Sequence, residues 1–127
     1  MTLKVLLVDD VDEVRRDLRT LLSLSSDLEI VGEAADGSEA IRLTESLQPD
    51  VVLIDFEMPV MDGYESTRLI KTRFPSRRVV VLTVHDYDAA RQRAKQSGID
   101  AFLVKGAPVE QLIQAILGEC DFIERNQ

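Results

Sequence analysis

The residues best suited to chemistry stand at the ends of short apolar runs. Runs 5–8, 51–54, 79–82 and 101–104 are followed in turn by Asp9-Asp10, Asp55, Thr83 and Lys105. Carboxylates that lie close together repel one another unless a cation sits among them. Carboxylate oxygens suit a hard divalent ion such as Mg²⁺. A lysine beside that ion would neutralise an anion such as a phosphoryl group, which a carboxylate can accept covalently.

These side chains can act together only if the fold brings the ends of the runs to one place. The four runs are almost continuously aliphatic, which is typical of parallel strands covered on both faces. Residues 28–34 instead alternate in part between apolar and charged residues, which predicts an edge strand with one wetter face. Helical periodicity follows each run, so we predict a doubly wound α/β fold, a flavodoxin-like (βα)5 sandwich. Its parallel sheet has the order 2-1-3-4-5, and the ends of the runs meet at the switch point.

Each predicted helix has its own boundary signal. In the first, Val14, Leu18, Leu21 and Leu22 form one stripe, and Asp12 and Glu13 favour its N-terminus. The second covers residues 39–48 with Ser38 as N-cap, and the third runs from about residue 63 to 73. The fourth, residues 88–97, has little apolar surface and is interpreted as a solvated helix with Gly98 at its C-cap. The fifth begins at Pro108.

Composition narrows the classes of function. The chain has 127 residues, 23 acidic against 15 Lys and Arg, and a formal net charge of −8. That balance argues against direct nucleic-acid binding, which needs clustered positive charge. No apolar stretch could span a membrane, and the N-terminus lacks a signal peptide. Cys120 is the single cysteine and excludes an intrachain disulfide. We expect one cytoplasmic domain over residues 1–127, with no membrane contact and no effector domain.

The chain resembles the response-regulator receiver domains of two-component signalling from Leu3 to about Leu117. The motifs that carry the resemblance are Leu6-Leu7-Val8-Asp9-Asp10, Asp55-Phe56-Glu57-Met58-Pro59, Met61-Asp62-Gly63, Leu82-Thr83 and Ala101-Phe102-Leu103-Val104-Lys105. The resemblance implies that Asp55 is the phosphoacceptor for a histidine kinase or phosphotransfer protein. It also implies a Mg²⁺ site made by Asp10, Asp55 and the backbone carbonyl of Glu57, with Asp9 acting through water.

The same resemblance assigns the switch. Lys105 would pair with the phosphoryl group, and Thr83 would move toward it. Phe102 stands at the family's switch-aromatic position, three residues before the lysine, where many members have tyrosine. Glu57 and His85, each two residues after a site residue, are candidates for tuning how fast the phosphoryl group is lost. Such a domain is not an enzyme beyond its own phosphorylation and slow autodephosphorylation.

One departure from the family pattern concerns the output. Many receivers have proline directly after the lysine, whereas here Gly106-Ala107 intervene before Pro108. This spacing resembles receivers of the NarL/LuxR kind, which are joined to helix-turn-helix DNA-binding domains. The resemblance therefore implies control of a transcriptional output domain or of a partner. It also implies homodimerisation on phosphorylation, and the sequence does not indicate which surface would form the dimer.

Two other functions compete with this interpretation. Residues 10–14 resemble the D-x-D-x-[TV] motif of haloacid-dehalogenase-type Mg²⁺-dependent phosphatases, with Asp10 as nucleophile. That class also needs an acidic pair at a strand end after the lysine, and the pair that follows here, Glu119 and Asp121, stands on a predicted helix. The second competitor is a receiver-like binding module that is never phosphorylated. Such modules usually lack a site residue, and this chain retains all of them.

Overall fold

The computed structural model describes residues 2–55, 63–83 and 88–118. Their strands are β1 (Leu3–Val8), β2 (Leu28–Ala34), β3 (Val51–Asp55), β4 (Arg78–Thr83) and β5 (Ala101–Val104). Their helices are α1 (Asp12–Leu22), α2 (Gly37–Leu47), α3 (Gly63–Arg73), α4 (Asp88–Gln96) and α5 (Val109–Leu117). All paired strands are parallel, in the order β2-β1-β3-β4-β5, which confirms the predicted fold class and topology.

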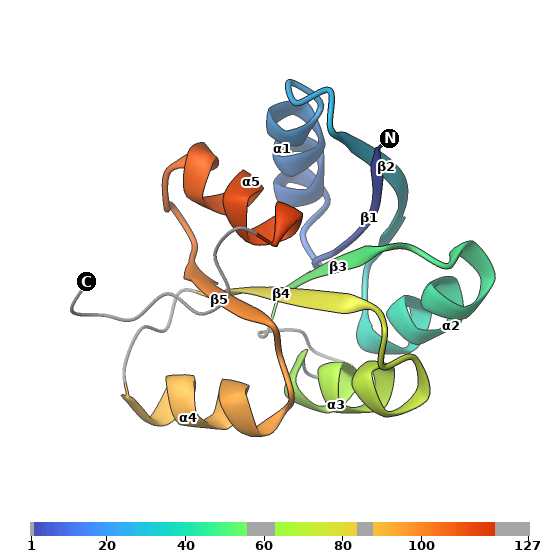
Figure 1. The fold of residues 1–127 in the computed structure, drawn as a ribbon, viewed down its shortest axis with the longest axis vertical. Helices are drawn as coiled ribbons and strands as arrows, with labels where there is room; N and C mark the ends of the chain where they lie inside the picture. The colour runs from blue at the N-terminus through green and yellow to red at the C-terminus, as the bar shows by residue number, and fades with distance from the viewer. Residues whose placement is uncertain (1, 56–62, 84–87, 119–127) are drawn as a thin grey trace.

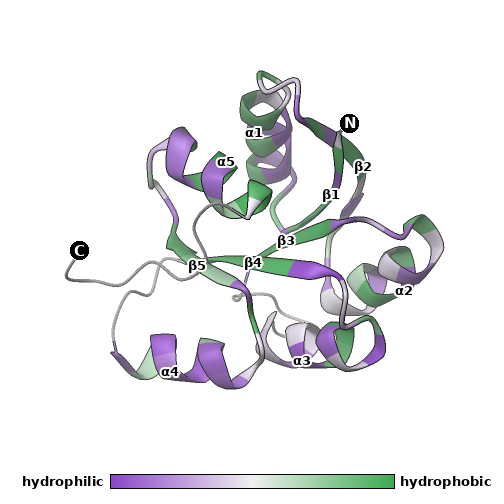
Figure 2. Ribbon diagram, viewed as in Figure 1, coloured by the Kyte–Doolittle hydropathy of each residue, from purple (hydrophilic) through white to green (hydrophobic). Residues whose placement is uncertain are grey.

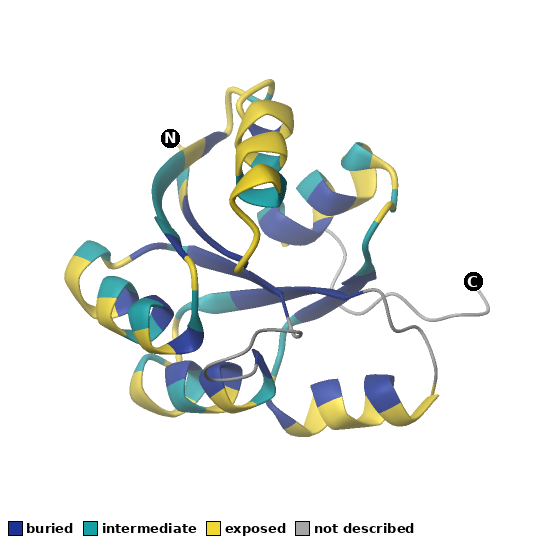
Figure 3. Cartoon of the chain, turned by 180° about the vertical axis from the view of Figure 1, so that it is seen from behind, coloured by how far each residue is buried: buried dark blue, intermediate teal, exposed yellow. Residues whose placement is uncertain are grey.

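The sheet is the middle of three layers. Helices α1 and α5 cover one face, and α2, α3 and α4 cover the other (Figure 1). Successive residues of β1 enter different cores: Val5 and Leu7 pack with Leu22 of α1, whereas Leu6 and Val8 pack on the side of Ile70 of α3. Both faces of the central strands are therefore apolar and buried (Figures 2 and 3), which explains why these strands read as continuous aliphatic runs.

The second strand is the edge strand that its alternating pattern predicted. It pairs only with β1, and most of its residues are partly exposed. The register shifts between Val5 and Leu6, opposite Ile30 and Gly32, so β2 has an extra residue at this point. No helix in the described part of the chain is long and apolar enough to cross a membrane.

Two helix starts differ from the sequence prediction. Ser38 is not the N-cap of α2; Asp36 is, and its carboxylate accepts a hydrogen bond of 2.9 Å from the Glu39 N–H. Glu39 in turn accepts one of 2.9 Å from the Ala35 N–H, so the two acidic side chains fasten the helix start reciprocally. In the fifth helix Pro108 is the N-cap, and the helix begins one residue later at Val109.

The interpretation of the fourth helix as simply solvated is wrong for one side of it. Arg91 is buried, and its guanidinium carbon lies 4.8 Å from the centre of the Phe102 ring. Arg93 stacks on Tyr64 of α3 at 3.8 Å. The only other residues of α4 that are buried are Ala90 and Ala94. Because it offers no large aliphatic side chain to the core, α4 is held in part by arginines stacked on aromatic rings.

Candidate functional site

Strand register brings the four predicted strand ends to one edge. Val8 is paired with Ile54, so Asp9 and Asp55 are level on β1 and β3. Asp55 is paired with Leu82, which places Thr83 one residue further along β4. Thr83 is paired with Val104, and Lys105 comes next. The residues therefore converge at the carboxyl edge beside the switch point between β1 and β3, where open α/β sheets bind ligands.

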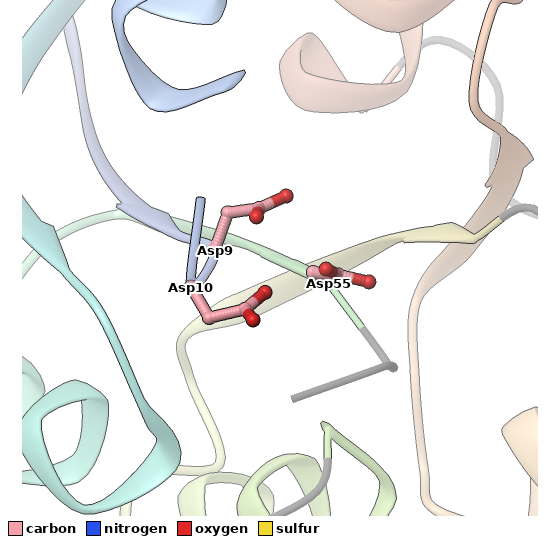
Figure 4. A group of neighbouring side chains, drawn as sticks. All are labelled: Asp9, Asp10 and Asp55. Atoms are coloured by element: carbon pink, nitrogen blue, oxygen red, sulfur yellow. The ribbon is translucent and has the colours of Figure 1, made fainter. Parts of the chain in front are cut away.

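Three carboxylates form a cluster at this edge. One carboxylate oxygen from each of Asp9, Asp10 and Asp55 lies within 4.8 Å of the others. Figure 4 shows the three side chains extending in the same direction, two from the segment after β1 and one from the end of β3. Asp9 and Asp55 are buried, while Asp10 is exposed. Two ionised groups held away from water are costly without a partner of opposite charge.

Lys105 supplies that charge. Its Nζ lies 3.2 Å from Oδ2 of Asp55 and 3.3 Å from Oδ2 of Asp9. The other oxygen of Asp9 accepts a hydrogen bond of 2.9 Å from the Val11 N–H. Burial lowers the pKa of Lys105, but the attraction of Asp55 and Asp9 outweighs it and leaves the pKa raised. The lysine is therefore a fixed positive charge at neutral pH.

The residues between Lys105 and Pro108 form a tight turn. The Ala107 N–H donates to the Val104 carbonyl at 3.1 Å, which closes a four-residue turn with Lys105 and Gly106 at its centre. Gly106 has φ of +95°, a conformation that glycine adopts without steric cost. None of the described peptide bonds is cis. Gly106 thus reverses the chain at the position where many receivers have proline.

Alternation along the strands divides the site residues between the two faces. Lys105 and Asp55 continue the rows of residues that pack toward α1 and α5. Thr83 continues the row of Val79 and Val81, which pack with Phe102 on the opposite face. Thr83 and Phe102 are both buried. The predicted switch pair therefore lies on the side of the sheet covered by α4, where Arg91 meets the Phe102 ring.

The donor set fits a hard divalent cation. If all four groups are ionised, the three carboxylates and Lys105 together carry a formal charge of −2, with oxygen ligands within 4.8 Å of one another. Hard oxygen ligands of this kind are the ones that Mg²⁺ prefers. The exposure of Asp10 provides access from solvent. The described residues thus form an acidic cluster of the size and charge that such an ion requires.

Comparison with known families shows which family the chain belongs to. The family model described as "Response regulator receiver domain" matches residues 5–117. The chain belongs to this family. The five strands and five helices of the described residues lie within or across the matched segment, so the resemblance seen in the motifs extends over the whole sheet.

Relatives place this receiver domain near regulators of the LuxR type. It is 40% identical over 116 residues to the response regulator protein VraR of Staphylococcus aureus, covering 91% of this chain and 56% of VraR. A LuxR-family two-component response regulator from an Aurantimonas species aligns with a TM-score of 0.91 at 31% identity, over 99% of this chain and 92% of that one.

The receiver domain of the putative regulator NarL from Mycobacterium tuberculosis gives a TM-score of 0.86 at 34% identity, over 91% of this chain and 94% of that one. A DNA-binding response regulator of the LuxR family from S. aureus gives a TM-score of 0.84 at 27% identity, over 91% of this chain and 96% of that one. The chain spans about half the length of VraR. It is therefore a receiver domain of two-component signalling whose close relatives include regulators with DNA-binding output.

Neither competing function is favoured. In the phosphatase motif the second aspartate would be Asp12, but this residue lies on the first turn of α1, is exposed and pairs with Arg15. The acidic cluster found among the described residues contains Asp55 in its place. Receiver domains are signalling modules rather than classical enzymes, and response regulators receive their phosphoryl groups from histidine kinases.

The structure also adds residues that the sequence did not single out. Glu57 and His85 lie outside the described residues, so their predicted roles stay predictions, and Cys120 lies outside them too. Arg15 was not predicted, yet it donates to the backbone carbonyl of Asp9. A basic residue three positions after an acidic one on a helix reads as an ordinary surface pair, and nothing in the spacing indicates the main-chain contact. Arg91 was missed for a similar reason.

Proposed function

We propose that Asp55 is the phosphoacceptor of this receiver domain. The observation that carries the proposal is the position of Asp55 at the end of the central strand, 3.2 Å from the Lys105 ammonium. A carboxylate oxygen of Asp55 bonds to the phosphorus of a donor phosphohistidine while the P–N bond breaks. The electron pair of that bond remains on the imidazole nitrogen. This chemistry depends mainly on positioning and on neutralising charge.

The neighbouring carboxylates are less suited to that role. Both oxygens of Asp9 already have partners, one in the Val11 N–H and one in Lys105. Asp10 is exposed and lies outside the two ion pairs of Lys105. Asp55 is buried and lies beside the Lys105 ammonium. This ammonium can stabilise the negative charge first on the carboxylate and then on the new phosphoryl oxygens.

Asp9, Asp10 and Asp55 would hold Mg²⁺, with Asp9 acting through water and the backbone carbonyl of Glu57 as a further ligand. When bound, this ion supplies positive charge that offsets the carboxylates and the phosphoryl oxygens. Phosphorylation adds a charge of roughly −1.5 to −2, by analogy with other phosphoresidues. Lys105 alone cannot balance that addition, which supports a requirement for the cation.

The residues proposed to carry the signal outward lie on the face of the sheet covered by α2, α3 and α4. Thr83 moves toward the phosphoryl group, and Phe102 responds because both residues lie in the same apolar layer. We propose that this movement changes how the domain meets a transcriptional output domain or a second copy of itself. The similarity to VraR and to LuxR-family regulators supports this output. Autodephosphorylation would be slow, with Glu57 and His85 setting its rate.

Intact-mass spectrometry after incubation with acetyl phosphate and Mg²⁺ tests the proposal. We expect the wild-type protein to gain the mass of one phosphoryl group, and EDTA to prevent the gain. The Asp55→Asn variant should gain nothing, whereas the control Asp27→Asn, at an exposed position in the loop before β2, should behave as wild type. An unmodified wild-type protein would favour the non-phosphorylated binding module.

A further inference from the structure

Arg15 connects three parts of the molecule next to the acidic cluster. One terminal nitrogen of its guanidinium donates to the backbone carbonyl of Asp9, and the other donates to the carboxylate of Asp12. Its Nε donates to Oε1 of Glu33 at 3.0 Å. The side chain is only 12% exposed. This is more than a surface ion pair, which would contribute little, because one of the three contacts is made with the main chain of the site.

Glu33 fixes the far end of this arrangement. It lies on β2, paired with Leu7 of β1, so it is anchored to the sheet beside the strand that leads into the site. Its second oxygen accepts from Nε of Arg19 at 2.8 Å. Burial raises the pKa of Glu33, but the hydrogen bonds from Arg19 and Arg15 outweigh it and leave the pKa lowered. Glu33 is therefore an ionised anchor that orients the Arg15 guanidinium.

The carbonyl held by Arg15 belongs to the peptide bond between Asp9 and Asp10. A peptide unit is planar, so fixing its carbonyl also fixes the direction in which the next residue leaves it. The same segment is held before and after this bond: the Asp9 N–H donates to the Ala34 carbonyl at 3.1 Å, and the Asp9 carboxylate accepts from Val11. Asp10 itself is exposed. Arg15 is thus the side chain that restrains its peptide from the α1 side.

We propose that Arg15 is a positioning residue for the divalent-cation site. It holds the Asp9–Asp10 peptide so that the Asp10 carboxylate meets those of Asp9 and Asp55. This inference rests on the cation site of the proposed function. It makes a prediction opposite to simple electrostatics, because a positive charge near the cluster repels a cation, and its removal alone would tighten binding.

Two substitutions of Arg15 separate the explanations. Arg15→Met removes the charge and the contacts, and Arg15→Lys keeps the charge but loses the planar fork that reaches three acceptors at once. We expect both variants to bind Mg²⁺ about tenfold more weakly than wild type, the lower end of the effect seen when partners of metal ligands are removed. Calorimetric titration of Mg²⁺ into the unphosphorylated protein measures the dissociation constant without relying on phosphorylation.

Arg19→Lys is the matched control. Arg19 binds the same glutamate, but it is Arg15 that reaches the Asp9 carbonyl, so substitution of Arg19 should change the dissociation constant by less than about twofold. Urea denaturation verifies that each variant is folded. Should Arg15→Met not fold, Glu33→Gln weakens the anchor instead and should weaken Mg²⁺ binding in the same direction.

The outcomes are distinct. Tighter or unchanged binding by Arg15→Met, or wild-type binding by Arg15→Lys, overturns the positioning role. An equal loss in Arg19→Lys assigns the effect to the ion-pair network as a whole and also overturns it. A wild-type protein that binds no Mg²⁺ contradicts the proposed function itself, and that result is seen before any variant is compared.

Discussion

Replacing Asp10 with asparagine should make the metal-free protein more stable and the Mg²⁺-loaded protein less stable than wild type. Asparagine has nearly the same shape as aspartate, so the substitution removes a charge and little else. Asp10 belongs to the acidic cluster but not to the two ion pairs of Lys105. Its charge therefore meets two carboxylates, and in the absence of a metal ion both interactions are repulsive.

The geometry sets the size of the effect. The carboxylate oxygens lie within 4.8 Å of one another, and at that upper limit each repulsive pair costs about 0.9 kcal/mol in water-like surroundings and about 3.5 kcal/mol at an effective dielectric constant of about 20. Asp10 is exposed, so the lower value applies and the two pairs together cost about 2 kcal/mol. The nearby N-terminus of α1 favours the carboxylate by roughly 0.5 kcal/mol. The net expectation is a stabilisation of about 1 kcal/mol.

Urea denaturation followed by far-ultraviolet circular dichroism is a suitable assay. In EDTA the midpoint of Asp10→Asn should rise by roughly 0.5 M with an unchanged slope, since a change of about 1 kcal/mol is divided by a slope of about 2 kcal/mol per M. In Mg²⁺ at about 100 times its dissociation constant, wild type should gain about 2.7 kcal/mol, and the variant should gain much less. The order of stability then reverses.

The reversal is the decisive feature. If Asp10→Asn is less stable than wild type in EDTA, the three carboxylates do not repel one another as the geometry requires. If Mg²⁺ leaves the wild-type midpoint unchanged, the cluster is not a cation site. A change in the slope would point instead to an altered unfolded state.

Three further predictions concern stability measured in the same way. Lys105→Met should destabilise the metal-free protein by about 3 kcal/mol, because it leaves two buried carboxylates without their cation. The pKa of Lys105 is raised above its ordinary value of 10.5. The stability that Lys105 contributes is therefore fully present below pH 10.5 and is lost only as the pH rises through the folded-state pKa. A stability difference between wild type and Lys105→Met that already vanished near pH 8 would contradict this account. Arg91→Met should cost about 1–2 kcal/mol through its buried stack on Phe102, and more than Arg93→Met, whose stack is exposed; equal losses would show that burial is irrelevant. Thr67→Val should be neutral or stabilising by up to about 1 kcal/mol, because the buried Thr67 hydroxyl has no hydrogen-bond partner in the described structure, and a clear destabilisation would reveal a partner.

The elements were predictable where apolar runs end at strong breakers. Residues 28–34 were predicted as the edge strand, and the strand has these bounds. The third helix was predicted from about residue 63 to 73, between a glycine and the Phe74-Pro75 pair, and it has these bounds too. The strand order 2-1-3-4-5 was the natural choice once the wetter strand was placed at the edge and the crossovers were taken as right-handed, and the structure has this order. Convergence of the strand-end residues then followed from topology alone.

What the sequence could not predict depends on choices between similar residues and on packing. Asp36 and Ser38 are both good N-caps, and they differ by a shift of two residues in where the helix begins. In the sequence Arg91 looks like a solvated charge, because the burial of its side chain and its contact with Phe102 exist only in the folded state. The contact of Arg15 with the Asp9 carbonyl could not be predicted for the same reason, because every residue has a backbone carbonyl and the sequence does not indicate which one a side chain will reach.

Mapping the phosphorylated residue tests the central claim most directly. The protein is incubated with acetyl phosphate and Mg²⁺, the acyl phosphate is reduced with borohydride to the stable alcohol, and tandem mass spectrometry of peptides locates the change. We predict that it falls on Asp55 alone, and that Asp10→Asn lowers the yield without moving the site. Modification of Asp10 in the wild-type protein, with Asp55 unchanged, would contradict the assignment of the phosphoacceptor.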